Sequence, residues 1–390
     1  MTFERGEGRA VWTLALTQAL GYACFFYVFA ALLLYWQRES WLSAGVIAAG
    51  PLVATLVSAM VAPTVGRALD RGQAVAMMAA GPVIGAAALA CLALAGGAVG
   101  WFVGWIGLGL AQALCLYDVC FGMMIRRFGG QARGAITRVT LVAGLASTLA
   151  FPAGAWLAAE WGWRGAVWCA VGVALGVMLP LQVWGARVLQ RGTEAAVTGR
   201  DQPRLGWGAV LRMPGFIGLA VLFSLVNLNH WMLVNLIRPM LEALSVAPDL
   251  AILAAAVIGP AQVLGRLALA GAGARLATGT AAWATVGVLM VAPVFLVLAA
   301  VWPVAAVGFA ACQGAAMGIV TILRPVLVAE TLGEERYGAV AGMMAIPGLA
   351  AMAVAPLIGT GLQALGGIWL MIGVAFALAV AAAGALAARR

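Results

Sequence analysis

The chain has 390 residues, of which 65% are apolar and 9% charged, and its mean hydropathy is +1.05. Soluble domains carry about 25% charged residues, so this chain has too few polar groups to cover a globular surface in water and is expected to lie in lipid. Its net charge of +9 would suggest nucleic-acid binding in a soluble protein. The arginines lie mainly in short segments between apolar runs, however, which is typical of membrane topology and argues against that class.

Apolar runs long enough to cross a bilayer follow one another along the chain, each with the length of about 20 residues that a membrane helix needs. In chain order they cover residues 11–36, 43–65, 74–96, 100–125, 137–159, 165–186, 214–240, 249–271, 277–299, 301–329, 338–364 and 367–388. The first run is too long for the apolar part of a signal peptide, so we expect it to be the first membrane helix. The predicted fold class is an all-α membrane protein with twelve transmembrane helices.

The longest polar stretch divides six predicted helices from six. It is too short and too polar to be a domain. We therefore expect an N-terminal six-helix bundle over residues 1–186, a cytoplasmic linker over residues 187–212 and a C-terminal six-helix bundle over residues 213–390.

The arginines predict the orientation in the membrane. With both termini inside, 17 of the 22 arginines fall on the inner side and 3 on the outer side, namely Arg38, Arg164 and Arg238. The remaining two, Arg266 and Arg324, lie within predicted spans. This bias predicts a multi-pass protein of the bacterial inner membrane with cytoplasmic termini.

The two halves resemble each other when the sequence is shifted by 204 positions. Glycines and prolines then coincide in pairs: Gly129 with Gly333, Gly134 with Gly338, Pro152 with Pro356, and Gly162 with Gly366. The preserved register across a loop and a helix predicts two six-helix repeats, and secondary transporters commonly hold their site between such repeats.

A short motif connects this architecture to a known family. The segment between the second and third spans has the sequence VGRALDRGQA, in which Gly66, Asp70, Arg71 and Gly72 resemble the Gly-x-x-x-Asp-Arg-x-Gly signature of the major facilitator superfamily. Here the final glycine follows Arg71 directly, so the motif is one residue short. The resemblance implies two pseudo-symmetric six-helix bundles and secondary transport by alternating access, with no enzymatic activity and no cofactor.

Within that superfamily the chain looks most like the monocarboxylate-transporter and oxalate–formate-antiporter branch. The segments GWR (162–164) and GPAQVLGRL (259–267) carry this resemblance. It implies that Arg266 contacts the carboxylate of a small organic anion. Gln262 stands where monocarboxylate carriers usually have an aspartate, so the resemblance does not extend to substrate identity or proton coupling.

Charged side chains in the middle of a span cost roughly 2.5–3.5 kcal/mol on insertion scales, so they are candidates for function. Arg266, with Gln262 one turn away, forms a polar patch whose guanidinium could hold a carboxylate with two hydrogen bonds. A structural ion pair, or a side chain that reaches toward the inner surface, is the alternative. Asp118 is the candidate for proton coupling, with a permanent ion pair to an arginine as its alternative.

The family resemblance implies that the first, fourth, seventh and tenth spans line the cavity, and polar residues form stripes along them. The predicted substrate-binding residues are Arg266, Arg324, Gln262, Gln313, Thr321, Asn227, His230, Tyr22 and Tyr117. The alternative for each is hydrogen bonding between helices without substrate contact. By position, the predicted gating residues Asp70, Arg71, Arg126 and Glu330 resemble the charge latch of the superfamily, although the arginines could serve topology alone.

No metal site is predicted. The six cysteines lie in apolar runs and are expected to be small buried side chains. Cys115 and Cys120 would lie about 140° apart on a helix, which argues against a shared soft-metal ligand pair. The motifs of intramembrane enzymes are absent from the sequence.

The leading hypothesis is therefore a transporter for a small organic anion, with proton coupling left open. We expect it to act as a monomer in the lipid bilayer, with a small-molecule substrate and no nucleic-acid partner. The first alternative is an efflux carrier for a small neutral, cationic or metalloid toxic compound, bound by aromatic residues together with Asp118. A non-transporting sensor or assembly factor with the same fold is the remaining alternative.

Overall fold

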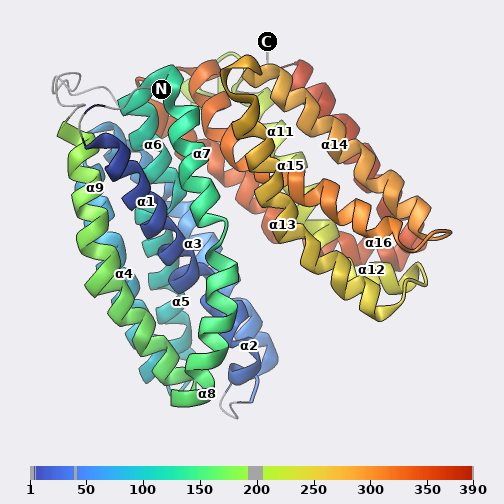
Figure 1. The fold of residues 1–390 in the computed structure, drawn as a ribbon, viewed down its shortest axis with the longest axis horizontal. Coiled ribbons are helices and arrows are strands. Elements are labelled where there is room, and N and C mark those ends of the chain that lie inside the picture. The colour runs from blue at the N-terminus through green and yellow to red at the C-terminus, as the bar shows by residue number, and fades with distance from the viewer. Residues whose placement is uncertain (1–3, 5, 39–41, 192–204, 389–390) are drawn as a thin grey trace. The chain divides into compact units, whose positions relative to one another are not determined.

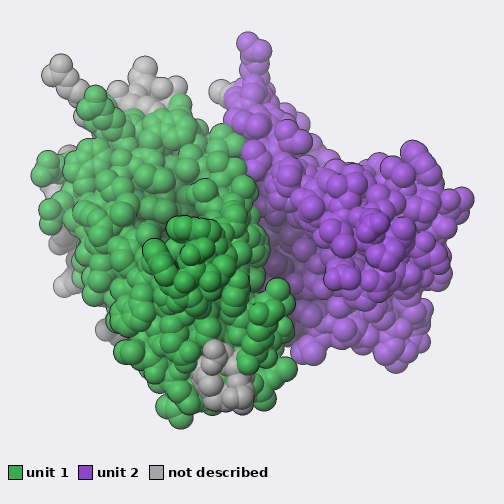
Figure 2. Space-filling view, turned by 60° about the horizontal axis from the view of Figure 1, so that its bottom comes forward, with its two compact units in different colours: residues 1–204, 334–343 green, residues 205–333, 344–390 purple. Residues whose placement is uncertain are grey.

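The computed structural model describes residues 4, 6–38, 42–191 and 205–388, and the regular secondary structure within these residues is helical (Figure 1). The chain divides into two compact units (Figure 2). Unit 1 comprises residues 1–204 and 334–343, and unit 2 comprises residues 205–333 and 344–390. Most of the predicted linker, residues 192–204, lies outside the described residues, as do Arg5, Arg200, Arg204, Arg389 and Arg390.

The predicted N-terminal bundle forms most of unit 1. Its elements are α1 (Glu7–Gly21), η1 (Tyr22–Phe26), α2 (Val28–Trp36), α3 (Ala44–Asp70), α4 (Ala74–Leu94), α5 (Ala98–Cys115), α6 (Tyr117–Phe128), η2 (Gly129–Gln131), α7 (Ala132–Ala143), α8 (Ala146–Val173), η3 (Ala174–Met178) and α9 (Leu179–Arg191). The last helix continues to Arg191, five residues into the stretch predicted as linker.

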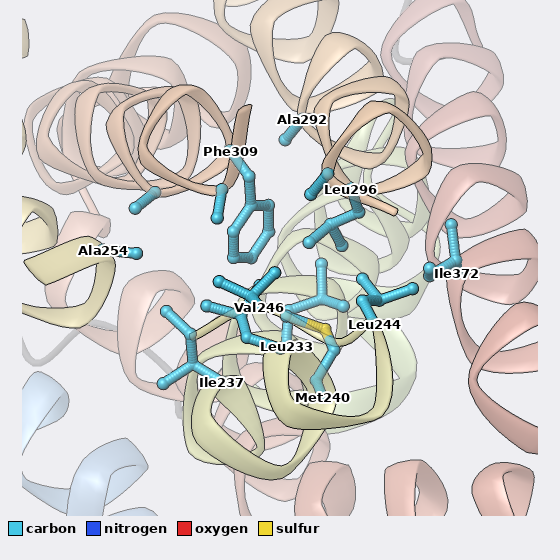
Figure 3. Packing of buried hydrophobic residues seen from close by; sticks show 14 of the residues in the cluster. Leu233, Ile237, Met240, Leu244, Val246, Ala254, Ala292, Leu296, Phe309 and Ile372 are labelled. Carbon is cyan, nitrogen blue, oxygen red and sulfur yellow. The ribbon is translucent and has the colours of Figure 1, made fainter. Parts of the chain in front are cut away.

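Unit 2 contains the C-terminal helices. They are α10 (Trp207–Leu211), α11 (Phe216–Asn235), α12 (Ile237–Ala243), α13 (Pro248–Ala272), η5 (Gly273–Arg275), α14 (Thr278–Ala299), α15 (Ala305–Leu332) and α16 (Tyr337–Ala387), whose first turns belong to unit 1. Apolar side chains of α11 to α16 form its core. In Figure 3 the ring of Phe309 points toward Val246 and Leu233, and all three side chains are buried.

All twelve predicted spans can be placed on these helices. Within the described residues there are nine helical stretches, some with short breaks, that are long and apolar enough to cross a membrane. Seven hold one predicted span each, the stretch Ala98–Arg191 holds three, and Tyr337–Ala387 holds two. Large apolar side chains on their outer surfaces are exposed, as a lipid-facing surface requires: Met60 is 77% and Leu94 is 74% accessible.

Glycines break the long stretches where the sequence repeat places them. Gly162 interrupts α8 with φ 68°, and Gly366 and Gly367 interrupt α16, where Gly367 has φ 70°. Residues with a Cβ rarely adopt this left-handed backbone, so glycine is favoured there. The paired glycines Gly129 and Gly333 follow α6 and α15, with φ values of 51° and 90°. The pair Gly129 and Gly333 therefore shares a positive φ, and the pair Gly162 and Gly366 shares the position of a helix break.

Candidate functional site

Arg266 lies in the last third of the membrane helix α13, six residues before its end at Ala272, and is almost completely buried, with 4% of its surface accessible. Its Nη2 donates a long hydrogen bond of 3.5 Å to Oε1 of Gln262, one turn earlier on the same helix. Its Nε and Nη1 have no hydrogen-bond partner, and no carboxylate pairs with it among the described residues. Buried arginines are ordinarily paired, because an unpaired charge in an apolar surrounding is costly. The Nε and Nη1 groups of Arg266 are therefore buried hydrogen-bond donors without an acceptor.

Close contact between α13 and α15 fixes the backbone around Arg266. A Cβ on Gly265 would collide with the backbone of Ala315, and one on Gly318 would collide with the carbonyl of Gln262. Gly314 and Gly318 form a Gly-x-x-x-Gly pair on α15, a spacing that lets membrane helices approach closely. The turn of α13 that precedes Arg266, with Gln262 and Gly265, is thus held by backbone contacts rather than by movable side chains.

We expect Gly265→Ala to lower the free energy of unfolding by about 1–3 kcal/mol, because the added methyl group meets backbone that cannot move aside. The midpoint of thermal unfolding in detergent measures this. Gly271→Ala on the same helix is the matched control, since a Cβ there meets nothing within 4 Å. Equal midpoints for the two variants would contradict the prediction.

The other predicted residues of unit 2 fall on the same two helices and on α11. Arg324 is half-buried on α15, and Oγ1 of Thr321 donates to the carbonyl of Gly318 at 2.7 Å. Asn227 on α11 donates from Nδ2 to the carbonyl of Phe223 at 2.8 Å. Both bonds are made to a carbonyl of the side chain's own helix.

His230 and Gln313 are brought together, as members of a buried polar chain. The His230 Nδ1 lies 3.0 Å from Oε1 of Gln313, whose Nε2 donates to Oδ1 of Asn229 at 2.9 Å. Asn229 in turn donates from Nδ2 to the carbonyl of Ala375 at 2.7 Å. The chain links α11, α15 and α16, and Asn229 is a member that the sequence stripes did not identify.

The members of this polar chain hydrogen-bond to one another. We therefore expect a substitution in the chain to change mainly the stability of the protein. Gln313→Leu should lower the free energy of unfolding by about 2–4 kcal/mol, since it leaves polar groups of His230 and Asn229 buried without a partner. Thermal unfolding and flux per folded molecule should be measured together. A variant of normal stability that has lost transport would instead assign Gln313 to the substrate.

In unit 1, Tyr22 of the first predicted span and Tyr117 of the fourth contact each other. Their ring centroids are 4.5 Å apart, and Tyr117 stacks on Phe121 at 4.5 Å. Asp118 lies in the first turn of α6, is exposed, and lines a small cavity together with Ser58 and Tyr337. Aromatic faces and one acid therefore lie close together on this unit.

The fourth span is discontinuous just before these residues. Leu116 has extended backbone angles between α5 and α6, and the carbonyl of Cys115 accepts hydrogen bonds from Nε2 of both Gln18 and Gln182, each at 2.8 Å. Gln112 likewise donates to the carbonyl of Phe25 in the widened turn η1, at 2.8 Å. In a membrane, such side chains replace the bonds that an interrupted helix loses.

Asp70 is the last residue of α3, and its carboxylate binds the N-terminus of α16. Its Oδ1 accepts from the backbone N–H of Gly338 at 2.8 Å and its Oδ2 accepts from that of Ala339 at 2.7 Å. One turn earlier, Gly66 lies so close to Gly338 that a Cβ on either residue would strike the other's backbone. The spacing Gly-x-x-x-Asp therefore has a local physical cause. Gly66 lets the start of α16 approach α3 closely, and the carboxylate of Asp70 caps that helix.

The other predicted gating residues are Arg126, Arg71 and Glu330, and each has different contacts. Arg126 donates to the carbonyl of Leu69, next to Asp70, so these two predicted residues are brought together. Arg71 is exposed, and Glu330 in unit 2 accepts from Oγ1 of Thr278 at 2.7 Å.

The neighbour of Arg126, Arg127, instead pairs with the start of α1. Its Nη2 lies 2.9 Å from a carboxylate oxygen of Glu4, and its Nε lies 2.5 Å from one of Glu7. No cluster of three or more metal-ligating side chains occurs in the part of the chain that the structure describes.

Comparisons with known proteins agree with this architecture. The sequence model of the Major Facilitator Superfamily matches residues 12–356. The chain is similar to the solved structure of a bacterial homologue of the iron transporter ferroportin in its outward-facing state, with 14% identity, a TM-score of 0.72, and coverage of 98% of this chain and 99% of that one.

Two further solved structures have similar coverage. The human organic anion transporter MFSD10 has 15% identity and a TM-score of 0.71, over 99% of this chain and 100% of that one. The transporter FucP in its outward conformation has 14% identity and a TM-score of 0.61, over 96% and 98%. At these identities the likeness concerns the fold alone. No curated protein matches the chain significantly.

Proposed function

This chain belongs to the Major Facilitator Superfamily, and from that premise we propose that it moves a small organic anion of the monocarboxylate type across the bacterial inner membrane. Members of this superfamily are secondary transporters that work by alternating access, not enzymes. Each binds a small-molecule substrate and lies in the lipid bilayer. The proposal concerns the chemistry of that substrate.

Arg266 carries the proposal. A buried guanidinium with unpaired Nε and Nη1 is a site that lacks its counter-charge, and a carboxylate supplies both the charge and the acceptor oxygens. Gln262 next to it contributes an amide that can orient a bound carboxylate. That MFSD10, a protein of the same fold, is an organic anion transporter is compatible with this chemistry.

The orientation is also proposed. The bias of the arginines supports cytoplasmic termini, so Asp70 and Arg126 would lie on the cytoplasmic side. There the capped start of α16 would act as part of the gate. We further propose that the protein works as a monomer.

A thermal-shift experiment tests the substrate class. The purified protein is screened against small carboxylates, with the corresponding amides as uncharged controls of the same shape. We expect a carboxylate to raise the midpoint of unfolding while its amide does not, because a ligand that binds the folded state alone stabilises it. Equal shifts from acid and amide, or no shift from any anion, would contradict the proposal.

We propose that Asp118 couples transport to protons, since it is an exposed carboxylate at the start of α6 beside the Tyr22–Tyr117 pair. Asp118→Asn should abolish accumulation driven by a pH gradient yet preserve exchange of labelled for unlabelled substrate, which needs no net proton movement. Proteoliposome uptake distinguishes the two modes. Gradient-driven accumulation that survives in the variant would exclude this role.

The aromatic group of unit 1 favours a second candidate function. Tyr22, Tyr117 and Phe121 form a continuous set of stacked or tilted rings beside Asp118, which suits a small neutral or cationic compound. In that case resistance to a toxic compound would survive Arg266→Gln but not Asp118→Asn. If the protein is instead an anion carrier, its activity should be lost in Arg266→Gln.

A further inference from the structure

An open groove runs along the outside of unit 1 where α9 passes α4. Its volume is about 710 Å³. It is lined mainly by one face of η3 and α9, with Ala79 of α4 on the other side. In Figure 1, α9 lies at the edge of the bundle that unit 1 forms. The lining residues used below are Leu175, Leu179, Val183, Trp184, Arg187 and Arg191.

The local sequence explains why the surface is hollowed there. Pro180 has no N–H, and its ring excludes the carbonyl four residues earlier, so the preceding turn widens into the π-helix η3. Gly172 and Gly176 carry no side chain, and a Cβ on either would meet nothing within 4 Å. The groove is lined by Leu175 of this widened turn and by Pro180.

The residues that line the groove change from apolar to aromatic to basic along η3 and α9. It begins with Leu175, Leu179 and Val183, passes Trp184, which is 44% exposed, and ends with two arginines one turn apart. Apolar residues suit acyl chains, tryptophan favours the boundary between hydrocarbon and headgroups, and arginine attracts anionic headgroups. This is the order that a phospholipid molecule presents from its chains to its phosphate.

The two arginines form a positive site on the surface of unit 1. Arg187 and Arg191 are exposed, and neither pairs with a carboxylate in the described parts of the chain. Side chains four residues apart on a helix lie about 6 Å from each other, so one phosphate can contact both guanidiniums. Charge complementarity therefore selects an anionic lipid over a zwitterionic one.

We propose that this groove binds one anionic phospholipid, with its acyl chains on Leu175, Leu179 and Val183 and its phosphate between Arg187 and Arg191. The site lies on the outer surface of unit 1 and is independent of the transported substrate. Its failure would therefore leave the anion-carrier proposal unchanged. The bound lipid would hold the C-terminal end of α9 at the membrane surface.

Native mass spectrometry with added phosphatidylglycerol or phosphatidylcholine tests this. We expect Arg187→Gln with Arg191→Gln to weaken phosphatidylglycerol binding at one site by about 30-fold, or about 5-fold per arginine, and to leave phosphatidylcholine unaffected. Arg275→Gln, which removes an exposed arginine of unit 2, is the matched control and should change nothing at that site.

If the double variant fails to fold, Arg191→Gln alone still tests the 5-fold step, because Arg191 is the last residue of α9. Unchanged phosphatidylglycerol binding, or equal loss with the Arg275 control, would overturn the proposal. Competition by millimolar inorganic phosphate without any role for the acyl chains would assign the groove to free phosphate, and would overturn it too.

Discussion

Arg266→Gln should abolish transport of anionic substrates while leaving the empty protein as stable as the wild type or more so. The guanidinium is a buried charge whose Nε and Nη1 have no partner, so its presence costs the ligand-free protein stability. Removing it should raise the free energy of unfolding by about 1–3 kcal/mol. Losing one charge-assisted bidentate contact should weaken anion binding by about 100-fold.

This combination separates a substrate site from a structural ion pair. Breaking a buried ion pair destabilises a protein by about 3–5 kcal/mol, which is opposite in sign to the change expected here. Arg275→Gln is the control for charge removal at an exposed position and should stay within about 0.5 kcal/mol of wild type. Thermal unfolding of both variants, together with carboxylate flux in proteoliposomes, distinguishes a substrate site from a structural ion pair. A destabilised Arg266→Gln that retains flux would exclude the anion site.

The spans and the repeat could be predicted because hydrophobicity and glycine usage are local properties of the sequence. A run of about 20 apolar residues identifies a membrane helix wherever it lies in the bundle. The pairing of Gly162 with Gly366 was visible as a shift of 204, and both positions are breaks in long helices. Glycine favours such breaks because it lacks a Cβ, and Gly162 has the left-handed φ of 68° that other residues rarely adopt.

Polar contacts between distant segments could not be predicted in the same way. Gln182 is a single glutamine in the apolar run 165–186, and its role depends on the break at Leu116, 66 positions earlier. The separate stripes that contain His230 and Gln313 can be identified in the sequence, but the hydrogen bonds that join them and Asn229 depend on how α11 meets α15. Periodicity places a residue on a helix face; the partner on the facing helix is a tertiary property.

Asp70→Ala should disable transport and loosen the start of α16. The substitution removes the acceptors for the N–H groups of Gly338 and Ala339, both of which are buried residues. Each unpaired buried N–H costs about 1–3 kcal/mol, so the free energy of unfolding should fall by about 2 kcal/mol or more. Because the contact holds α3 to α16, its loss should also shift the balance between transport states, which flux measurements report.

Asp249→Ala is the matched control for Asp70→Ala. Asp249 is an exposed acid in the first turn of α13. Its negative charge interacts favourably with the dipole of that helix, but its carboxylate does not cap a buried N–H. Its removal should cost no more than about 0.3–1 kcal/mol. Amide hydrogen exchange at residues 337–343 should accelerate in Asp70→Ala alone, since the cap is local to that turn. Unchanged exchange there, together with normal flux, would mean that Gly66 and its backbone contacts hold α16 without the carboxylate.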